Sequence, residues 1–448
     1  MRTYRIVPFL FFLIFLTACS LLEGPQPVIL PTAIPTPPPL NLEQVSGELV
    51  FDPVSDVVPA IDRELQVLMN QVSRQSLIGY VQTLEGFQTR NTYSSVDDPA
   101  FGIGAARLWI FNEFIRVGNG RLLVEMDDFV VNNNGLINTQ QNVIATLPGT
   151  SPHAGVIVIM GHYDSRTIDP FDGESFAPGA NDNASGVAAM LEIARILSSR
   201  DWNQTIVFAA FAAEEQGRLG SQNYVTAEML AGTTFDAAIN NDIIGGRPGI
   251  PQSIRLFTPG PETSEPRQIA RYINFISSLY LPQFPITLEP TRDREGRFSD
   301  HITFLDVGVP AIRLTESIED PDVQHNALDT SNLIDYDYLV KATQLNFITA
   351  AHMVGGPPRP VSPAWAPMAD PGGYILTWPV DDLAAGYAMS FRVAGDPNYP
   401  PFRFVAAEEA GNVAITGLDP NVSYLVSIAA ISDTGRMGLF SPEIIVGP

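Results

Sequence analysis

The chain has 448 residues, enough for two to four domains at roughly 100 to 200 residues each, so a single small module is excluded. Hydrophobic residues make up 45% of the chain and aromatic residues 9%, which predicts packed cores and excludes wholesale disorder. The formal net charge of -24 has the wrong sign for binding a phosphate backbone, so we expect no nucleic-acid partner.

The N-terminus has the features of an export signal. Arg2 and Arg5 precede an apolar run over residues 6–16, which as a helix would span about 16 Å, against about 30 Å of hydrocarbon in a bilayer. The run is too short for a stable membrane span, and together with its basic start it predicts a signal peptide.

The signal would end at the only cysteine of the chain. Leu16-Thr17-Ala18-Cys19 resembles the bacterial lipobox, and this resemblance implies that Cys19 becomes the lipid-carrying first residue of the mature protein. Residues 1–19 are therefore predicted to be a lipoprotein signal peptide. The protein would be exported and held at the membrane of the bacterial cell envelope or surface through lipidated Cys19. The alternative is an ordinary signal peptide in which Cys19 is incidental.

A proline-rich stretch follows. Seven of the sixteen residues from 24 to 39 are proline, which favours an extended polyproline spacer over a folded element. At about 3.1 Å per residue, this stretch would hold a folded body about 50 Å from the bilayer. Residues 20–43 are therefore predicted to be a linker.

Residues 44–356 alternate helical patterns with short apolar runs, the pattern of an α/β fold. After Gly186, apolar residues recur at helical spacing and predict a helix. Near-continuous apolar strands joined by helices predict a mostly parallel sheet with helices on both faces, and active sites at the carboxyl ends of its strands. The candidate buried strands are Val156–Met160, Thr205–Phe211, Ala237–Ile239 and Ala311–Leu314.

Five short polar clusters follow the predicted strands or open the helix between them. They contain His162 with Asp164, Asp182, Glu214 with Glu215, Asp242, and His325. Each alone has an ordinary explanation: a histidine–carboxylate pair, a helix cap, a solvated charge pair, a turn residue or a surface histidine. Jointly, two imidazoles and three carboxylates form a nitrogen and oxygen ligand set that suits zinc and, less well, manganese or cobalt.

One cysteine cannot supply a thiolate metal site, so any metal must be held by histidines and carboxylates. Two metal ions about 3.5 to 4 Å apart need a bridging carboxylate, because bare cations at that distance repel each other. Asp182 is the natural candidate for this bridge.

The clusters and their order match a family. GHYDS (161–165), GANDNASG (179–186), AAEEQG (212–217), NNDIIGG (240–246), FSDH (298–301) and QHNALDT (324–330) resemble the secreted co-catalytic zinc aminopeptidases, whose relatives include glutamate carboxypeptidases. The resemblance extends from a helix near Ser73 to one ending near Met353. It implies a cofactor of two zinc ions per chain, one held by His162, Asp182 and Asp242 and the other by Asp182, Glu215 and His325. It further implies that Asp164 orients His162 and that Glu214 is the general base.

The chain departs from the family pattern at one position. Many relatives have a tyrosine just before the last histidine ligand, where its hydroxyl can steady the oxyanion, and this chain has Gln324. The oxyanion role is therefore unassigned. The cluster Ser299, Asp300 and His301 is expected near the substrate but is left out of the catalytic set.

Residues 357–448 have a different, strand-like pattern that predicts a small all-β sandwich. Alternating apolar residues cover 374–378, 387–393 and 424–431, with turn signals between them. Trp378, and the segment leading to Tyr424, resemble the fibronectin type III pattern with its tyrosine corner. This domain is expected to be a spacer or stabilising unit, with a surface ligand as the alternative.

The most favoured function is an exported, membrane-anchored two-zinc aminopeptidase that hydrolyses N-terminal residues from peptide substrates. A carboxypeptidase would need cations for the terminal carboxylate, and Arg292, Arg294 and Arg297 keep that alternative open. A glutaminyl cyclase is less favoured because such relatives use one metal. A non-catalytic surface binding protein is the alternative from another class.

Overall fold

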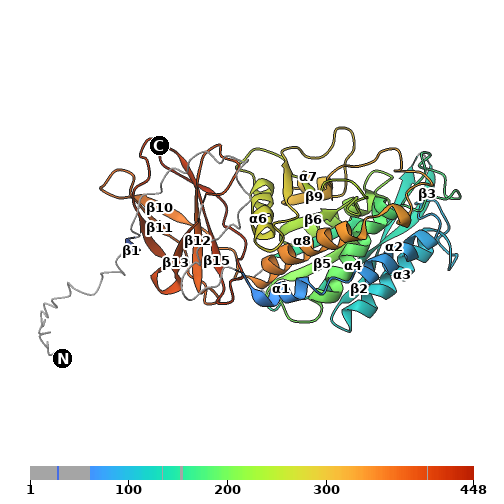
Figure 1. The fold of residues 1–448 in the computed structure, drawn as a ribbon, viewed down its shortest axis with the longest axis horizontal. Helices are drawn as coiled ribbons and strands as arrows, with labels where there is room; N and C mark the ends of the chain where they lie inside the picture. The colour runs from blue at the N-terminus through green and yellow to red at the C-terminus, as the bar shows by residue number, and fades with distance from the viewer. Residues whose placement is uncertain (1–27, 30–60, 134, 152–154, 401) are drawn as a thin grey trace, which may run out of the picture.

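The computed structural model describes residues 28–29, 61–133, 135–151, 155–400 and 402–448. They form an α/β body and a C-terminal β domain that lie side by side (Figure 1). The predicted signal peptide with Cys19 lies outside the described residues, as does the predicted linker apart from Val28–Ile29. No helix in the described part of the chain is long and apolar enough to cross a membrane.

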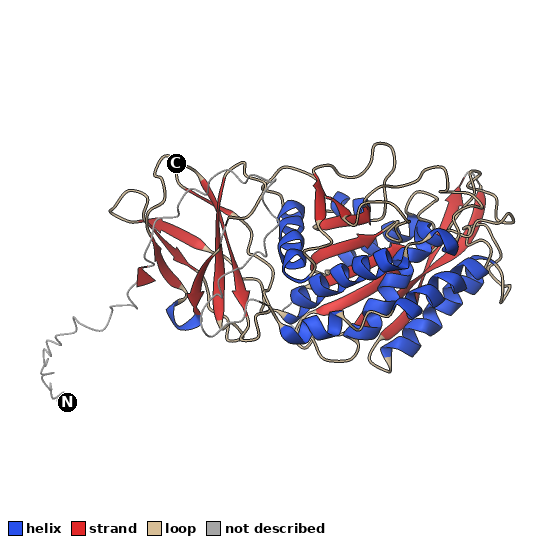
Figure 2. Cartoon of the chain, viewed as in Figure 1, coloured by secondary structure: helices blue, strands red, loops and turns tan. Residues whose placement is uncertain are grey.

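An eight-stranded sheet forms the centre of the body (Figure 2). Its strands are β2 (Leu123–Asn133), β3 (Leu136–Leu147), β4 (Val156–His162), β5 (Thr205–Phe211), β6 (Phe235–Asn241), β7 (Ile254–Phe257), β8 (Ile286–Glu289) and β9 (Ala311–Glu316). Their order across the sheet is β2-β3-β5-β4-β6-β9-β7-β8. The four strands predicted from the sequence, β4, β5, β6 and β9, are parallel neighbours, as expected.

The outer strands make the sheet mixed. β2 pairs antiparallel with β3, β3 with β5, and β7 with β9, while β7 and β8 are parallel. The β2–β3 pair is a hairpin, and two strands joined by a short turn can only be antiparallel. Four of the seven strand pairs in this sheet are parallel, so the expectation of a mostly parallel sheet is confirmed, and the antiparallel pairs involve the outer strands.

Alternate residues of the central strands face opposite sides of the sheet. Along β4, Ile157 and Ile159 belong to one buried apolar cluster, and Val158 and Met160 belong to another. This alternation follows from the two-residue period of a strand, and it explains why the strand is a continuous apolar run. Both faces must then be covered by helices.

Two groups of helices cover the two faces. The helices of the body are α1 (Arg63–Met69), α2 (Arg74–Gly86), α3 (Gly102–Gly118), α4 (Ser185–Leu197), α5 (Leu219–Ala231), α6 (Glu265–Tyr280), α7 (His301–Asp306) and α8 (Tyr336–Gly355). Helices α5 and α7 pack on one face and the other six helices contribute to the larger cluster on the opposite face (Figure 1). Short turns η2 (Ala180–Ala184) and η3 (Ser331–Leu333) precede α4 and α8.

The C-terminal domain consists of two four-stranded sheets (Figure 1). One sheet has the order β1-β14-β11-β10 and the other β13-β12-β15-β16. The elements are β1 (Val28–Ile29), β10 (Ala364–Pro367), β11 (Tyr374–Thr377), β12 (Gly386–Val393), β13 (Arg403–Ala406), η4 (Ala407–Glu409), β14 (Asn412–Ile415), β15 (Tyr424–Ile431) and β16 (Ile444–Val446). The Tyr424 hydroxyl accepts a hydrogen bond from the Asp419 backbone N–H at 3.2 Å. The assignment to the fibronectin type III class stays a prediction.

The body and the C-terminal domain share one continuous apolar core, which includes Met437 and Phe440 of the latter. The Tyr272 hydroxyl of α6 donates to the Met437 carbonyl oxygen at 2.6 Å, and the Met437 N–H donates to His352 Nδ1 at 3.2 Å. Arg436 forms an ion pair of 2.6 Å with Asp62, the N-cap of α1. The C-terminal domain is thus docked through buried apolar, hydrogen-bonded and charged contacts.

Candidate metal centre

The sequence-predicted site residues meet at the carboxyl ends of the central strands. His162 is the last residue of β4, and Asp242 directly follows β6. Glu214 and Glu215 lie in the turn after β5, and His325 lies in the loop after β9. Parallel neighbours end at the same edge of a sheet, so residues up to 163 positions apart in sequence come together here.

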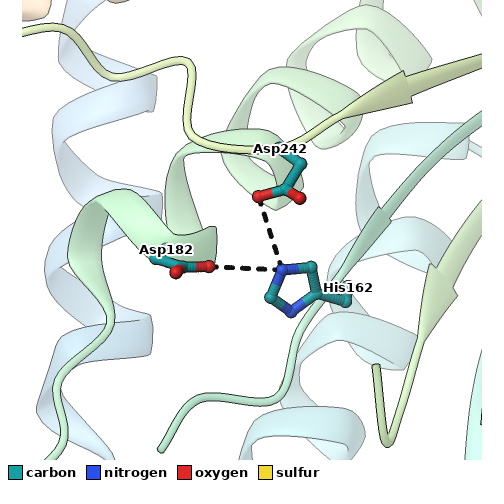
Figure 3. Close-up of side chains that lie close together, drawn as sticks. All are labelled: His162, Asp182 and Asp242. Atoms are coloured by element: carbon teal, nitrogen blue, oxygen red, sulfur yellow. Dashed lines mark ion pairs between the residues drawn. The ribbon is translucent and has the colours of Figure 1, made fainter. Parts of the chain in front are cut away.

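Asp182 lies between the two histidines. Its Oδ1 is 3.3 Å from His162 Nε2, and its Oδ2 is 3.2 Å from His325 Nε2. Asp242 Oδ1 lies 3.6 Å from His162 Nε2, and Figure 3 shows the His162 ring pointing toward both aspartates. Glu215 Oε1 lies 3.2 Å from His325 Nε2. Two groups of three possible ligands therefore share Asp182, each with its ligand atoms within 4.8 Å of one another.

The backbone around Asp182 is fixed by hydrogen bonds to neighbouring elements. The N–H groups of Asn181 and Asp182 donate to the two carboxylate oxygens of Asp329 at 2.8 and 2.9 Å. The Asn183 side chain donates to the Asn241 carbonyl oxygen at 2.8 Å and accepts from the Gly186 N–H at 3.0 Å. These contacts tie the turn before α4 to the end of β6 and to the His325 loop.

Asp164 connects the two sides of the site. Its carboxylate accepts hydrogen bonds from the backbone N–H groups of Glu214 and Glu215, both at 3.1 Å, and its Oδ1 lies 3.5 Å from His162 Nδ1. The Asp164 carbonyl oxygen is 3.1 Å from the same ring nitrogen. These groups hold the His162 ring with Nε2 toward Asp182, which is the orientation that a metal ligand requires.

Two arginines that the sequence analysis missed neutralise the outer carboxylates. Arg313 lies 3.1 Å from Asp242 Oδ2, and Arg166 donates to Glu215 Oε2 at 2.6 Å. The remaining oxygens, Asp242 Oδ1 and Glu215 Oε1, are buried and have no hydrogen-bond partner. An arginine inside the predicted buried strand Ala311–Leu314, whose other residues are apolar, was a usable signal, since a buried arginine needs an acidic partner.

The chemistry of this donor set fits two zinc ions. The two buried oxygens without hydrogen-bond partners are the same atoms that face the histidines, and an unsatisfied buried carboxylate oxygen is costly unless a cation pairs with it. Two imidazole nitrogens and carboxylate oxygens are ligands that zinc accepts. His162, Asp182 and Asp242 would hold one ion, and Asp182, Glu215 and His325 the other.

The charges of the site perturb its titratable groups. Burial raises the pKa of Glu214 well above its ordinary value, and Glu215 and Asp242 act in the same direction while His162 opposes them. Burial lowers the pKa of His325, but the nearby carboxylates of Asp182 and Glu215 outweigh it and raise the pKa to about 9. In metal-free protein at neutral pH, His325 therefore holds a proton that a bound cation would displace.

Asp300, which the sequence analysis left out of the catalytic set, is fully buried beside this site. Burial raises its pKa to about 7; the charge of His162 opposes the rise, and Asp164 and Asp242 add to it. Next to it, Ser299 Oγ accepts a hydrogen bond of 2.6 Å from the Asn240 side chain. The cluster is therefore part of the buried surroundings of the site.

A cleft of about 220 Å³ opens onto the site. Its walls contain the five possible metal ligands and Glu214. The other residues that line it are Arg166, Gly217, Ile243, Arg294, Gly296, Arg297 and Phe298. A neighbouring cavity of about 270 Å³ is lined in part by Asn181, Gln324 and Asp329.

Comparison with known proteins assigns the family. The profile of Peptidase family M28 matches residues 142–349. A protein of Pyricularia oryzae named "Probable zinc metalloprotease" is 33% identical over 409 residues, which cover 76% of this chain and 82% of the relative. The chain belongs to peptidase family M28, which confirms the family resemblance seen in its sequence motifs.

Solved structures agree on the fold. LapB from Legionella pneumophila is similar with a TM-score of 0.55 and 21% identity, over 65% of this chain and 75% of that chain. An aminopeptidase from Aneurinibacillus sp. strain AM-1 is similar with a TM-score of 0.52 and 16% identity, over 65% of this chain and 96% of that chain. The α/β fold with a central sheet flanked by helices is therefore confirmed.

Proposed function

We propose that this M28 peptidase is a zinc-dependent aminopeptidase that uses two zinc ions. The observation that carries the proposal is the position of Asp182, whose two carboxylate oxygens each face a different histidine at 3.2 to 3.3 Å. The naming of its relatives as zinc metalloproteases and the aminopeptidase among its structural neighbours support it.

The residues of the site divide the work of peptide hydrolysis. When bound, the zinc ions would lower the pKa of a water molecule and polarise the scissile carbonyl. Glu214 lies in the cleft beside the ligands and takes the proton from the attacking water, then delivers it to the leaving amine. Asp164 positions both His162 and the Glu214–Glu215 backbone.

Replacing Glu214 tests this division of roles. Glu214→Gln keeps the shape of the side chain but removes the proton acceptor, so we expect kcat to fall by at least roughly 100-fold on aminoacyl p-nitroanilides. The bound zinc, measured by metal analysis, and the melting temperature should not change. An unchanged rate would exclude Glu214 as the base, and fewer than one ion per wild-type chain would contradict the two-zinc centre.

A substrate panel separates the rival activities. Arg294 and Arg297 line the cleft and favour a carboxypeptidase as the second candidate, because they could hold a terminal carboxylate. An aminopeptidase should cleave C-blocked dipeptides and spare N-blocked ones, and a carboxypeptidase should do the reverse. Inactivity toward free, N-blocked and C-blocked dipeptides, with zinc present, would favour a non-catalytic surface binding protein.

We also propose an exported protein anchored to the membrane through lipidated Cys19, with a fibronectin type III-like C-terminal domain that serves as a stabilising unit or binds a surface ligand. The lipobox-like segment and the Tyr424–Asp419 hydrogen bond support these two parts. Cys19→Ala should move the protein from the membrane fraction to the soluble fraction. Equal distribution of both forms would contradict the anchor.

A further inference from the structure

Arg297 has a fixed place in the wall of the cleft. It closes a tight turn in which its N–H donates to the Arg294 carbonyl oxygen at 3.3 Å and Gly296 adopts a left-handed φ of 71°. Asp293, just before this turn, accepts from the Ser299 N–H and from Arg313, which also contacts Asp242. The turn is therefore attached to the group that neutralises a possible metal ligand.

The three arginines of the cleft differ in how their charge is balanced. Arg166 is paired with Glu215, and Arg294 forms an ion pair of 2.5 Å with Glu319. Arg297 donates to the neutral Gln324 side-chain oxygen at 2.6 Å, and no carboxylate within the described ranges forms an ion pair with it. Arg297 thus presents a positive charge that the protein holds in position without neutralising it.

Gln324 holds the Arg297 side chain in position without neutralising its charge. Its side chain is 7% exposed, and its oxygen orients the guanidinium while it adds no negative charge. Two of the four cleft carboxylates, Asp242 and Glu215, contact other arginines, and none of the four forms an ion pair with Arg297, so the Arg297 charge remains for a ligand. A guanidinium matches a carboxylate in both charge and planar hydrogen-bond geometry.

We propose that Arg297 binds a substrate carboxylate next to the scissile bond, so that this peptidase selects peptides with an acidic group there. The inference rests on the proposed peptidase function and names its substrate class. The carboxylate has two possible sources, which are the side chain of an N-terminal glutamate or aspartate and the free C-terminus of a dipeptide. Either would pair with the same guanidinium.

The test compares substrates that differ only in charge. With zinc-loaded wild type, kcat/KM for glutamyl p-nitroanilide should exceed that for glutaminyl p-nitroanilide by roughly 10-fold or more, because a charged hydrogen bond is lost with the amide. Arg297→Gln should remove this preference by lowering kcat/KM for the glutamyl substrate far more than kcat/KM for leucyl p-nitroanilide. Arg297→Lys should restore part of it.

Arg292→Gln is the matched control. Arg292 belongs to the same segment but is exposed, pairs with Asp306 and does not line the cleft, so its loss should leave the glutamyl preference intact. Leu-Leu compared with its C-terminal amide distinguishes the second source, since an Arg297-dependent preference for the free acid would assign the carboxylate to the C-terminus.

Three results would overturn the proposal. The first is equal rates for glutamyl and glutaminyl substrates together with equal rates for Leu-Leu and its amide. The second is an equal loss of activity on every substrate in Arg297→Gln, and the third is an equal effect of Arg292→Gln.

A readout without turnover separates the proposal from the peptidase function. Calorimetry should show that the zinc-loaded Glu214→Gln protein binds glutamate more tightly than glutamine, and that adding Arg297→Gln abolishes the difference. Activity on leucyl substrates with neither this difference nor an Arg297-dependent preference for the free acid of Leu-Leu would leave the peptidase function standing and refute the role of Arg297.

Discussion

Asp242 and Glu215 each direct one carboxylate oxygen toward an arginine and the other toward a histidine. Burial alone would raise the pKa of Asp242, but Arg313 and His162 outweigh it and hold the pKa well below the ordinary value. Asp242 therefore stays ionised at any pH at which the protein works, as a metal ligand must. Burial and the charge of Asp182 act to raise the pKa of Glu215, but His325 and Arg166 outweigh them and lower it.

Asp164 gives a prediction at this scale. Asp164→Asn places an amide NH2 near the N–H groups of Glu214 and Glu215, where only an acceptor fits both, and it weakens the support of His162. We expect zinc affinity to fall by roughly 10- to 100-fold in competition with a chelator. Asp169→Asn, in an exposed part of the same loop, should have no effect. Unchanged affinity in Asp164→Asn would show that the carboxylate does not support the ligands.

The sequence was informative about the proposed metal ligands and silent about the residues that hold them in position. His162, Asp182 and Asp242 stand out because polar residues directly after apolar strands are chemically distinctive. Arg313 lies inside β9, where its pairing with Asp242 depends on which strands are neighbours. The contact between Gln324 and Arg297 depends on the path of two loops, which no local pattern fixes.

At the scale of elements, the first turn of α4 must approach the end of β6 very closely. A Cβ atom on Gly186 would lie 2.3 Å from the Asn241 carbonyl oxygen and 2.6 Å from Asn183 Oδ1. Glycine is the residue that allows this approach. The packing of α4 against β6 therefore determines where Asp182 lies.

Gly186→Ala tests this dependence. We expect a loss of about 1 to 3 kcal/mol in the free energy of unfolding, measured with denaturant, and weaker zinc binding as the turn shifts. Gly79→Ala, in α2 with no atom within 4 Å of the new Cβ, should leave stability unchanged or raise it by about 0.4 to 1 kcal/mol. Equal effects of the two substitutions would contradict the close-approach argument.

The strands that could be predicted from the sequence are those buried on both faces of the central sheet. The four central strands are uninterrupted apolar runs, and the structure has them as parallel neighbours. β2 was missed because it is an edge strand with exposed apolar residues such as Leu123 and Val130 alternating with acidic ones. β7 and β8 have only four residues each and carry too little pattern to be recognised.

At the scale of the whole molecule, His352 joins the body to the C-terminal domain. Its Nδ1 accepts from the Met437 N–H, and its Nε2 lies 2.9 Å from the Tyr280 hydroxyl. Burial, with the charge of Arg436, lowers the pKa of His352 to about 4, while Asp62 opposes the shift. A proton on Nδ1 would face the Met437 N–H, so the contact requires a neutral ring.

This shift predicts a pH dependence of stability. Because the folded-state pKa is below the ordinary value of 6.5, the unfolded chain binds the proton more readily between about pH 4 and 6.5. The contribution of His352, roughly 3 kcal/mol, should be complete above pH 6.5 and decline as the pH falls toward 4. His352→Gln should show a shallower decline in melting temperature over this range, with both proteins free of zinc. Parallel profiles would contradict the prediction.

The ion pair between Arg436 and Asp62 joins residues 374 positions apart. The first helix of the body therefore gains one of its anchoring contacts only when almost the entire polypeptide has been synthesised. Closing so long a loop is entropically costly and slow. A nascent chain emerging from the ribosome would thus lack this contact at its leading end until synthesis is almost complete.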